Sequence, residues 1–565
     1  MTRYIVSVSD RNYSEWSVKY EGCEENREVI MSICPSSEKL FSGDIFSTEN
    51  DTTIQLHYSP TRELDKIPGV LQLQCAKTFG RTQNGRLLYK CIPHQKDLPA
   101  FLVPYNIKPG FDKTNVNKYV IFRFSDWVGK HPVGTIIETL GSVNDLEPFY
   151  EYQMHCRNLQ HSVTRFTHTV HETLKIGSYN DHIATMEQNN RFQIIDKSDQ
   201  YVFTIDPIGS VDLDDGLSIS PHPINPEHTV VSVYIANVCL WLEHLELWDH
   251  LSDRVSTIYL PDCKRNMIPS LLADKWCSLN EKEKSVVFAM DLVFDQHGLL
   301  IESPHMYNAV IRVRKNFRYE ESKLLKNAHY QKLSALTTKM DSGVHDSHDV
   351  VAFWMMKMNT LCANRLHEHK TGLFRTATLL DGDNKSPPNF SPETNRALSM
   401  WNNVSGSYQL YEEGVEMKHA MMNNRKYVQI TSPIRRLVDV LNQLMFCTSI
   451  LQCDLSLTFL QKWTPRISEL NCDMKSIRKV QSECEMVHMC STNPDVVNQI
   501  YEGIVFEKQS GKRGDFTYNV YLEDLRKMMK LKTTCELDEY SKHKVQLFLF
   551  ETEDNCRRKI RIGLM

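Results

Sequence analysis

The stretch TIDPIGSVDLDDGLS, from Thr204 to Ser218, decides how the rest of the chain is interpreted. Its four aspartates, Asp206, Asp212, Asp214 and Asp215, fall within ten positions. Carboxylates this close repel one another, and holding them partly buried is costly unless a cation offsets the repulsion. Ligands made only of oxygen favour a hard ion, Mg²⁺ with Mn²⁺ as the alternative, over zinc. The spacing therefore predicts a metal site.

A solvated acidic loop is the alternative interpretation of this stretch. The residues on either side favour the metal site. Residues 201–205 form an apolar, β-favouring run that Pro207 and Gly209 interrupt directly after the first aspartate. The second apolar run, VVSVYIANV, covers residues 230–238. A loop held between two core strands can aim its carboxylates at one point.

Three segments in the same order resemble the RNase II/RNB family of exoribonucleases. The first is the aspartate stretch itself. The second, IYLPDCKRNMIPSLLADKWCSL from Ile258 to Leu279, is similar to the family's Tyr-Leu-Pro, Met-Leu-Pro and Leu-Cys-Ser-Leu block. The third, ITSPIRRLVDVLN from Ile430 to Asn442, is similar to its Thr-Ser-Pro-Ile-Arg-Arg segment. Three motifs in order argue against chance, and they resemble the RNase II and RNase R type without a PIN domain.

The resemblance implies a role for individual residues. In the two-metal scheme, ions about 4 Å apart activate a water and stabilise the leaving oxygen at phosphorus. Asp214 matches the aspartate on which catalysis depends most, and Arg435 matches an arginine that contacts the scissile phosphate. For Arg435 alone, or for its neighbour Arg436 alone, the default interpretation would be a salt bridge at the protein surface. The implied metal ligands are Asp206, Asp212, Asp214 and Asp215, and the implied catalytic residues are Asp214, Arg435 and Arg436.

Aromatic residues are the candidates for RNA contact. Tyr259 matches a tyrosine that packs against terminal nucleotides, and Tyr319 resembles a second one near the 3′ end. Trp127 is expected to stack on a base from an N-terminal barrel, because such barrels bind single strands through aromatic side chains. Of the aromatic residues in such barrels, roughly half are expected to lie in the core instead of contacting RNA.

Some positions depart from the family pattern. Where relatives usually carry two glutamates, this chain has Ala352 and Phe353, which leaves sugar discrimination and end-product length open. Further departures are Asn237, Gln429 and Gln443, which stand in place of an aspartate and two histidines. These positions support the site, so the reaction class is unaffected.

Length and composition agree with a large nuclease. The chain has 565 residues, of which 41% are hydrophobic and 24% charged, with a net charge of −5. Phosphate binding must then depend on locally concentrated cations. The chain has no long apolar run and no apolar signal core, so we expect an intracellular protein, cytoplasmic or nuclear and not secreted, without membrane contact. Sixteen cysteines without a C-x-x-C pair indicate reduced thiols.

The predicted fold is multidomain, α/β plus all-β. Short strands indicate tandem cold-shock-like OB barrels, a mixed α/β RNB catalytic domain and a C-terminal OB barrel. Within the catalytic domain, residues 348–366 have helical periodicity. The expected boundaries are 1–55 for an extension, 56–110 and 111–195 for the two barrels, 196–492 for the RNB domain and 493–565 for the last barrel.

The resemblance implies a Mg²⁺-dependent exoribonuclease that degrades single-stranded RNA from the 3′ end to nucleoside 5′-monophosphates. Its partners would be RNA and an RNA-decay complex, or RNA alone for a monomer. Two alternatives stay open: an inactive RNA-binding scaffold, and a nuclease with relaxed discrimination between RNA and DNA. The presence of all four aspartates and Arg435 favours an enzyme.

Overall fold

The computed structural model describes two compact units, each assembled from segments distant in sequence. The first comprises Met1–Gln160, Leu260–Asp262 and Ser482–Met565, and the second His161–Tyr259 and Cys263–Gln481. Among the described residues, no helix has the length and apolar character needed to cross a membrane. The description covers residues 2–565 except 23–27, 30–32, 50–52, 76, 108–114, 378–389, 392–393, 396, 399–405, 418, 420–424, 512–513 and 552–557.

The N-terminal part of the first unit is a five-stranded sheet followed by a closed barrel. The sheet has the order β3-β2-β1-β4-β5 and the barrel the order β10-β8-β7-β6-β9. The sheet strands are β1 (Tyr4–Val8), β2 (Trp16–Tyr20), β3 (Glu28–Val29), β4 (Ile45–Glu49) and β5 (Thr53–Tyr58), with the short helix α1 (Pro60–Glu63) after them. The barrel strands are β6 (Ile67–Leu71), β7 (Leu88–Pro93), β8 (Phe101–Pro104), β9 (Lys118–Asp126) and β10 (Val133–Ser142).

The sheet and the barrel share one core, and this differs from the predicted boundaries. Buried residues from both, among them Val6 and Phe46 of the sheet and Phe101 and Phe122 of the barrel, form a single hydrophobic cluster. The boundary expected after residue 110 falls inside the barrel, because β6 pairs with β9 across it. The residues expected as an extension form strands of the sheet. Short strands predict a barrel but do not say which strands close it.

The C-terminal part of the first unit is a second closed barrel, with the order β21-β22-β23-β25-β24. Its core contains Val505, Val520, Leu531, Val545 and Leu547, all fully buried. Its elements are α13 (Asp495–Asn498), β21 (Ile500–Ser510), β22 (Phe516–Leu522), β23 (Lys527–Thr533), β24 (Lys542–Glu551) and β25 (Arg558–Leu564), whereas α2 (Leu146–His155) follows β10 of the first barrel.

The second unit is built on a six-stranded mixed sheet with the order β11-β18-β12-β13-β14-β17, in which β17 also pairs with β18. Apolar residues alternate with polar ones along β13 and fill most of β12, β14 and β17, as expected for strands covered by helices. The strands are β11 (Ile194–Asp196), β12 (Val202–Asp206), β13 (Asp215–Pro221), β14 (Thr229–Ala236), β17 (Lys284–Phe294) and β18 (His305–Arg318).

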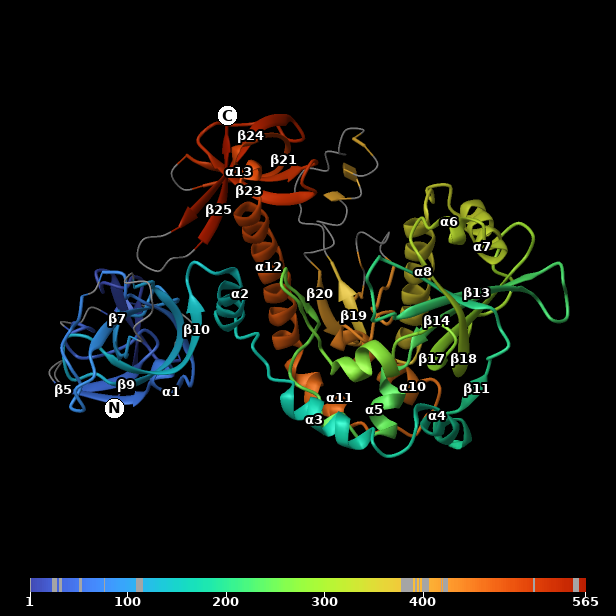
Figure 1. The fold of residues 1–565 in the computed structure, drawn as a ribbon, viewed down its shortest axis with the longest axis horizontal. Helices are drawn as coiled ribbons and strands as arrows, with labels where there is room; N and C mark the ends of the chain where they lie inside the picture. Colours follow the sequence, from blue (N-terminus) through green and yellow to red (C-terminus); the bar gives the residue numbers. More distant parts are fainter. Residues whose placement is uncertain are drawn as a thin grey trace. The chain divides into compact units, whose positions relative to one another are not determined.

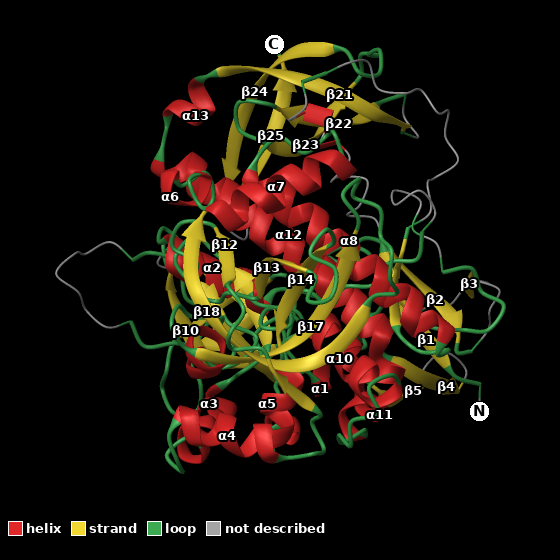
Figure 2. Ribbon diagram, turned by 90° about the vertical axis from the view of Figure 1, so that its right-hand side faces the viewer, coloured by secondary structure: helices red, strands yellow, loops and turns green. Residues whose placement is uncertain are grey.

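Helices and short strands complete this unit. Helix α8 lies against the sheet (Figures 1 and 2). Its buried Trp354, Met358 and Cys362 belong to the hydrophobic cluster that the sheet strands also form. This helix confirms the helical prediction for residues 348–366. The elements are α3 (Thr164–Thr173), α4 (Tyr179–Gln188), α5 (Val238–His244), η1 (Trp248–His250), β15 (Ile258–Tyr259), β16 (Lys264–Arg265), η2 (Leu272–Trp276), α6 (Ser322–Leu325), α7 (Ala328–Met340), α8 (Ser347–Glu368), β19 (Leu373–Thr376), β20 (Ser407–Leu410), α10 (Leu437–Ser449), α11 (Thr458–Trp463) and η4 (Thr464–Arg466), while α12 (Ile467–Thr492) has residues in both units.

The predicted fold class is confirmed: the chain combines OB-like five-stranded barrels with a central mixed α/β unit.

Candidate active site

The aspartate stretch connects β12 to β13 in the second unit. Asp206 is the last residue of β12 and Asp215 the first of β13, so the two strand ends bring both carboxylates together. The segment between them is held by Ser278, which accepts from the Leu213 amide (3.0 Å) and donates to the Val211 carbonyl (2.8 Å). The second sequence motif, which contains Ser278, therefore fixes the shape of the first.

Among the described residues, Asp206 and Asp215 form no ion pair, unlike Asp212 and Asp214. Asp206 is 8% exposed, and one of its oxygens, Oδ2, is buried without a hydrogen-bond partner. Burial raises the pKa of Asp206 to about 6. Burial also raises the pKa of Asp215 well above its ordinary value, and the negative charge of Asp206 adds to this shift. This pair has the electrostatic frustration that a bound cation would relieve.

Asp214 is held by the third sequence motif. Its carboxylate is 3% exposed and accepts from the backbone amide of Ile434 (3.0 Å) and from Nε of Arg435 (3.2 Å). Burial raises the pKa of Asp214 to about 7, while the Arg435 guanidinium opposes the rise. The side chain of Arg435 is 45% exposed, so part of the guanidinium is accessible to a ligand.

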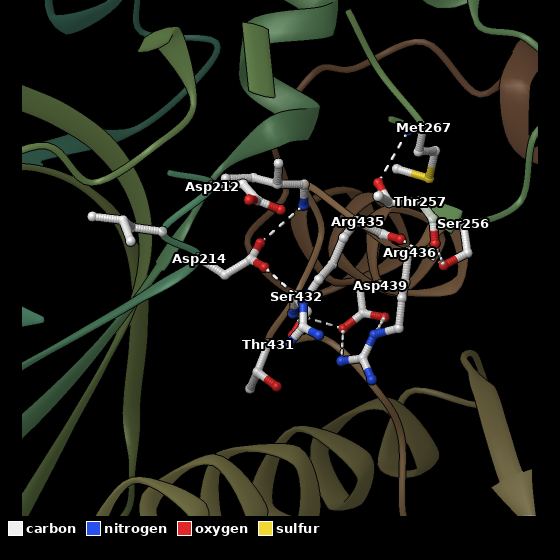
Figure 3. A network of polar contacts seen from close by, with 12 residues as sticks. Asp212, Asp214, Ser256, Thr257, Met267, Thr431, Ser432, Arg435, Arg436 and Asp439 are labelled. Carbon is white, nitrogen blue, oxygen red and sulfur yellow. Dashed lines mark hydrogen bonds and ion pairs between the residues drawn. The ribbon is translucent and has the colours of Figure 1, made fainter. Parts of the chain in front are cut away.

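The turn that carries Arg435 is organised by Asp439, a residue that the sequence analysis missed. Figure 3 shows Ser432 and Arg436 both turned toward the Asp439 carboxylate, which accepts from the Ser432 amide and from Nη2 of Arg436, both at 2.8 Å. The Arg435 carbonyl accepts from the Ser256 hydroxyl (2.8 Å). Asp439 is fully buried. The signal available in the sequence was an aspartate three residues after the second arginine, inside the apolar run LVDVL.

Arg436 occupies a different place from Arg435. Its Nε lies 2.8 Å from Asp439, and its side chain is only 19% exposed. Asn359 supports the same motif, because its amide oxygen accepts from the Ile430 backbone amide (3.0 Å). The contacts of Arg436 favour a positioning role for it over direct phosphate contact.

Asp212 is paired with other residues. Its Oδ1 accepts from Nζ of Lys264 (3.0 Å) and its Oδ2 from the hydroxyl of Tyr259 (3.3 Å). Lys264 also donates to Asp274 (2.8 Å). Partial burial, together with Asp212, raises the pKa of Tyr259 to about 12. Lys264 and Asp274 carry no family signature and were not predicted.

The three predicted RNA-binding aromatics have different surroundings. Tyr259 is 44% exposed. The ring of Tyr319 stacks on His348 with centroids 3.6 Å apart and planes 11° from parallel. The structure corrects the prediction that Trp127 stacks on a base. This residue lies in the core of the first unit and is 7% exposed, and its ring centroid is 4.6 Å from that of Phe41. Its ring already packs against protein, because it fills the core shared by the sheet and the barrel, so it cannot stack on a base.

The donor chemistry of the four aspartates fits a hard divalent cation. All donors are carboxylate oxygens, and Asp206 offers a buried oxygen with no protein partner. Within the described residues, no three acidic, histidine or cysteine side chains gather at metal-binding spacing. Asp212 and Asp214 are each turned toward a cationic side chain of the protein, and this arrangement accounts for the incomplete cluster.

The comparisons with known proteins agree with the sequence motifs. Residues 194–342, which carry the aspartates and all six strands of the sheet, match the RNB domain. The chain carries an RNB domain. The resemblance read from the three motifs is thereby confirmed. Ribonuclease R of Aquifex aeolicus is 34% identical over 129 residues, which cover 22% of this chain and 18% of that relative.

Solved structures show the same fold at low identity. RNase R of Mycoplasma genitalium in complex with ribose methylated single-stranded RNA has a TM-score of 0.67 at 14% identity, covering 100% of both chains. Yeast Ssd1, described as a pseudonuclease, has a TM-score of 0.57 at 12% identity, covering 94% of this chain and 78% of Ssd1. The fold therefore occurs both in a ribonuclease and in a protein described as inactive, and the site residues must decide between these functions.

Proposed function

We propose that this RNB-family chain is a metal-dependent exoribonuclease that shortens single-stranded RNA from its 3′ end and releases nucleoside 5′-monophosphates. The observation that carries the proposal is the buried pair of Asp206 and Asp214, which stands with the partly buried Asp215 beside Arg435. A scaffold that only binds RNA has no need to bury repelling carboxylates against an arginine, because the arrangement costs stability.

The residues that would hold Mg²⁺ are Asp206 and Asp215, with Asp212 and Asp214 completing the set. Bound Mg²⁺ supplies charge stabilisation for in-line phosphodiester hydrolysis, and the two-ion scheme is part of this proposal. Asp214 has a second task, since its contact with Nε fixes the orientation of the Arg435 guanidinium.

Arg435 would act directly on the substrate. Its Nε is held by Asp214 and its Nη2 by the Ser432 hydroxyl (3.0 Å), while nearly half of the side chain stays exposed. A guanidinium fixed in this way can donate to a phosphate oxygen where negative charge develops in the transition state. Because the donor is oriented before the substrate arrives, little reorganisation is needed during the reaction.

Two aromatic side chains would position the RNA end. Tyr259 is partly exposed and reaches Asp212 through its hydroxyl, so a nucleotide at its ring would lie beside the acidic cluster. Tyr319 is backed by the His348 ring, which presents a flat two-ring platform for a terminal base. Stacking is tolerant of base identity, and this fits an enzyme that removes every nucleotide in turn.

Polarity and product are tested by digestion of one RNA labelled at either end. We expect the 5′-labelled strand to shorten in a ladder, and the 3′-labelled strand to release a labelled nucleoside 5′-monophosphate at once. The matching DNA strand should stay intact, and a chelator should stop the reaction. A ladder from the 3′-labelled strand would reverse the polarity, internal fragments would indicate an endonuclease, and an intact RNA that is nonetheless bound would favour the scaffold.

A further inference from the structure

Lys264 is the one feature of the acidic cluster that the proposed function leaves unexplained. It stands directly opposite Tyr259 in the antiparallel pair of β15 and β16. From these facing positions both side chains reach the same carboxylate: Lys264 contacts Oδ1 of Asp212 at 3.0 Å and Tyr259 contacts Oδ2 at 3.3 Å. Both oxygens of Asp212 thus have a protein partner.

A second carboxylate holds Lys264 on its other side. Asp274, in η2, accepts from Nζ at 2.8 Å, a shorter contact than the one to Asp212. The side chains of Lys264, Asp212 and Asp274 are 26%, 12% and 25% exposed, so the triad is partly shielded from water and salt. Coulomb interactions at such sites are stronger than at the open surface. Asp274 can therefore keep its contact with the Lys264 ammonium when Asp212 binds another cation.

The four aspartates divide into two kinds by their partners. Asp212 and Asp214 each contact a cationic side chain, whereas Asp206 keeps a buried oxygen without a hydrogen-bond partner and Asp215 forms no ion pair with any described residue. Arg435, the partner of Asp214, contacts the substrate in the proposed mechanism. Lys264, the partner of Asp212, has no role in that mechanism.

We propose that Lys264 is a displaceable counter-ion, a positioning residue that holds Asp212 in the metal-free protein and moves onto Asp274 when a divalent cation takes Asp212. The inference rests on the proposed function in that it takes Asp212 as a metal ligand. It deepens that function, because metal affinity would then be set by competition between the ammonium and the divalent ion for one carboxylate. No bond is made or broken in the exchange.

The test measures binding of Mn²⁺ alone to the full, RNA-free chain by titration calorimetry, with electron spin resonance of free Mn²⁺ as a second readout. In Lys264→Met the competing charge is gone, and we expect Mn²⁺ to bind on the order of tenfold tighter. In Asp274→Asn the ammonium has only Asp212 left, and we expect weaker binding by a factor on the order of three or more. The matched control is Lys282→Met, which removes a lysine whose side chain is 84% exposed and should leave the affinity unchanged.

The double variant separates the exchange from general electrostatics. If Asp274 acts by receiving the ammonium, the weakening caused by Asp274→Asn should shrink when Lys264 is already methionine. Equal effects of Asp274→Asn in both backgrounds would overturn the inference. So would Mn²⁺ binding to Lys264→Met that is unchanged or weaker, because a merely structural lysine would give this result. Absence of Mn²⁺ binding to the wild-type chain would instead overturn the metal-dependent function itself, and the inference with it.

Discussion

The most demanding structural prediction concerns Asp439, which organises the turn that presents Arg435. Its carboxylate is fully buried and holds the Ser432 amide together with two nitrogens of Arg436. Both hydrogen bonds end on Oδ1, which an asparagine keeps, whereas in Asp439→Asn an NH2 group replaces Oδ2 and faces Nε of Arg436. Two donors then meet, and the guanidinium, with a side chain only 19% exposed, loses its counter-charge. Removing one partner of a buried pair typically costs about 3 kcal/mol or more.

This cost should appear locally, at the start of α10. A chain of several domains does not unfold in one step, so hydrogen exchange read by mass spectrometry is the suitable assay. About 3 kcal/mol corresponds to exchange on the order of 100-fold faster in the peptide that covers α10. We also expect RNA turnover to fall, since the turn positions Arg435.

Two further variants make this prediction specific. Glu368→Gln removes the ion-pair partner of Arg365; the side chain of Glu368 is 58% exposed and that of Arg365 is 47% exposed. This change should alter the local free energy of protection by about 0.5 kcal/mol at most. The double variant Arg436→Met with Asp439→Leu removes both charges and should recover part of the protection, although turnover stays low. Exchange in Asp439→Asn that matches Glu368→Gln would refute the reasoning.

Two other predictions follow from the same structure. Arg435→Ala should lower RNA turnover by a factor on the order of 10² while RNA affinity changes little, because it removes one transition-state donor. Steady-state rates measure the turnover and filter binding measures the affinity. An unchanged rate would exclude Arg435 from the site. Burial and the neighbouring Glu469 raise the pKa of Asp473 to about 6, so its ionisation destabilises the folded chain as pH rises from about 4 through 6. The side chain is partly exposed, so water screens part of this effect, and Asp473→Asn should be more stable than wild type at pH 7.5 by about 2 kcal/mol at most, and not at pH 4. Hydrogen exchange in the peptide that covers this part of α12, compared between variant and wild type at each pH, tests this, and a gain only at low pH would contradict it.

The sequence predicted the part of the site that is set by local patterns. The ends of β12 and β13 bring Asp206 and Asp215 together because apolar runs define both strands and a proline ends the first. The contact between Asp214 and Arg435 joins residues more than two hundred positions apart, and only the family resemblance related those two segments. The pairing of Lys264 with Asp212 and Asp274 could not be predicted, because it depends on which side chains face each other across two very short strands.

The N-terminal region shows a different limit of sequence patterns. Glycine-punctuated strands indicate barrels, but closure depends on long-range pairing such as β6 with β9, which leaves no local signal. Trp127 illustrates the same limit for function. An aromatic residue at the end of a strand can stack on a base or fill a core, and its contacts with Phe41 and Tyr13 place it in the core.

The measurement that tests the central claim most directly compares wild type with Asp214→Asn on one 5′-labelled single-stranded RNA in Mg²⁺, with RNA affinity measured in parallel. The account predicts that wild type shortens the strand from the 3′ end, whereas Asp214→Asn binds it with affinity within a few-fold of wild type and leaves it intact. Shortening by Asp214→Asn at a rate close to wild type would contradict the account, and so would a wild-type chain that binds the RNA and never shortens it.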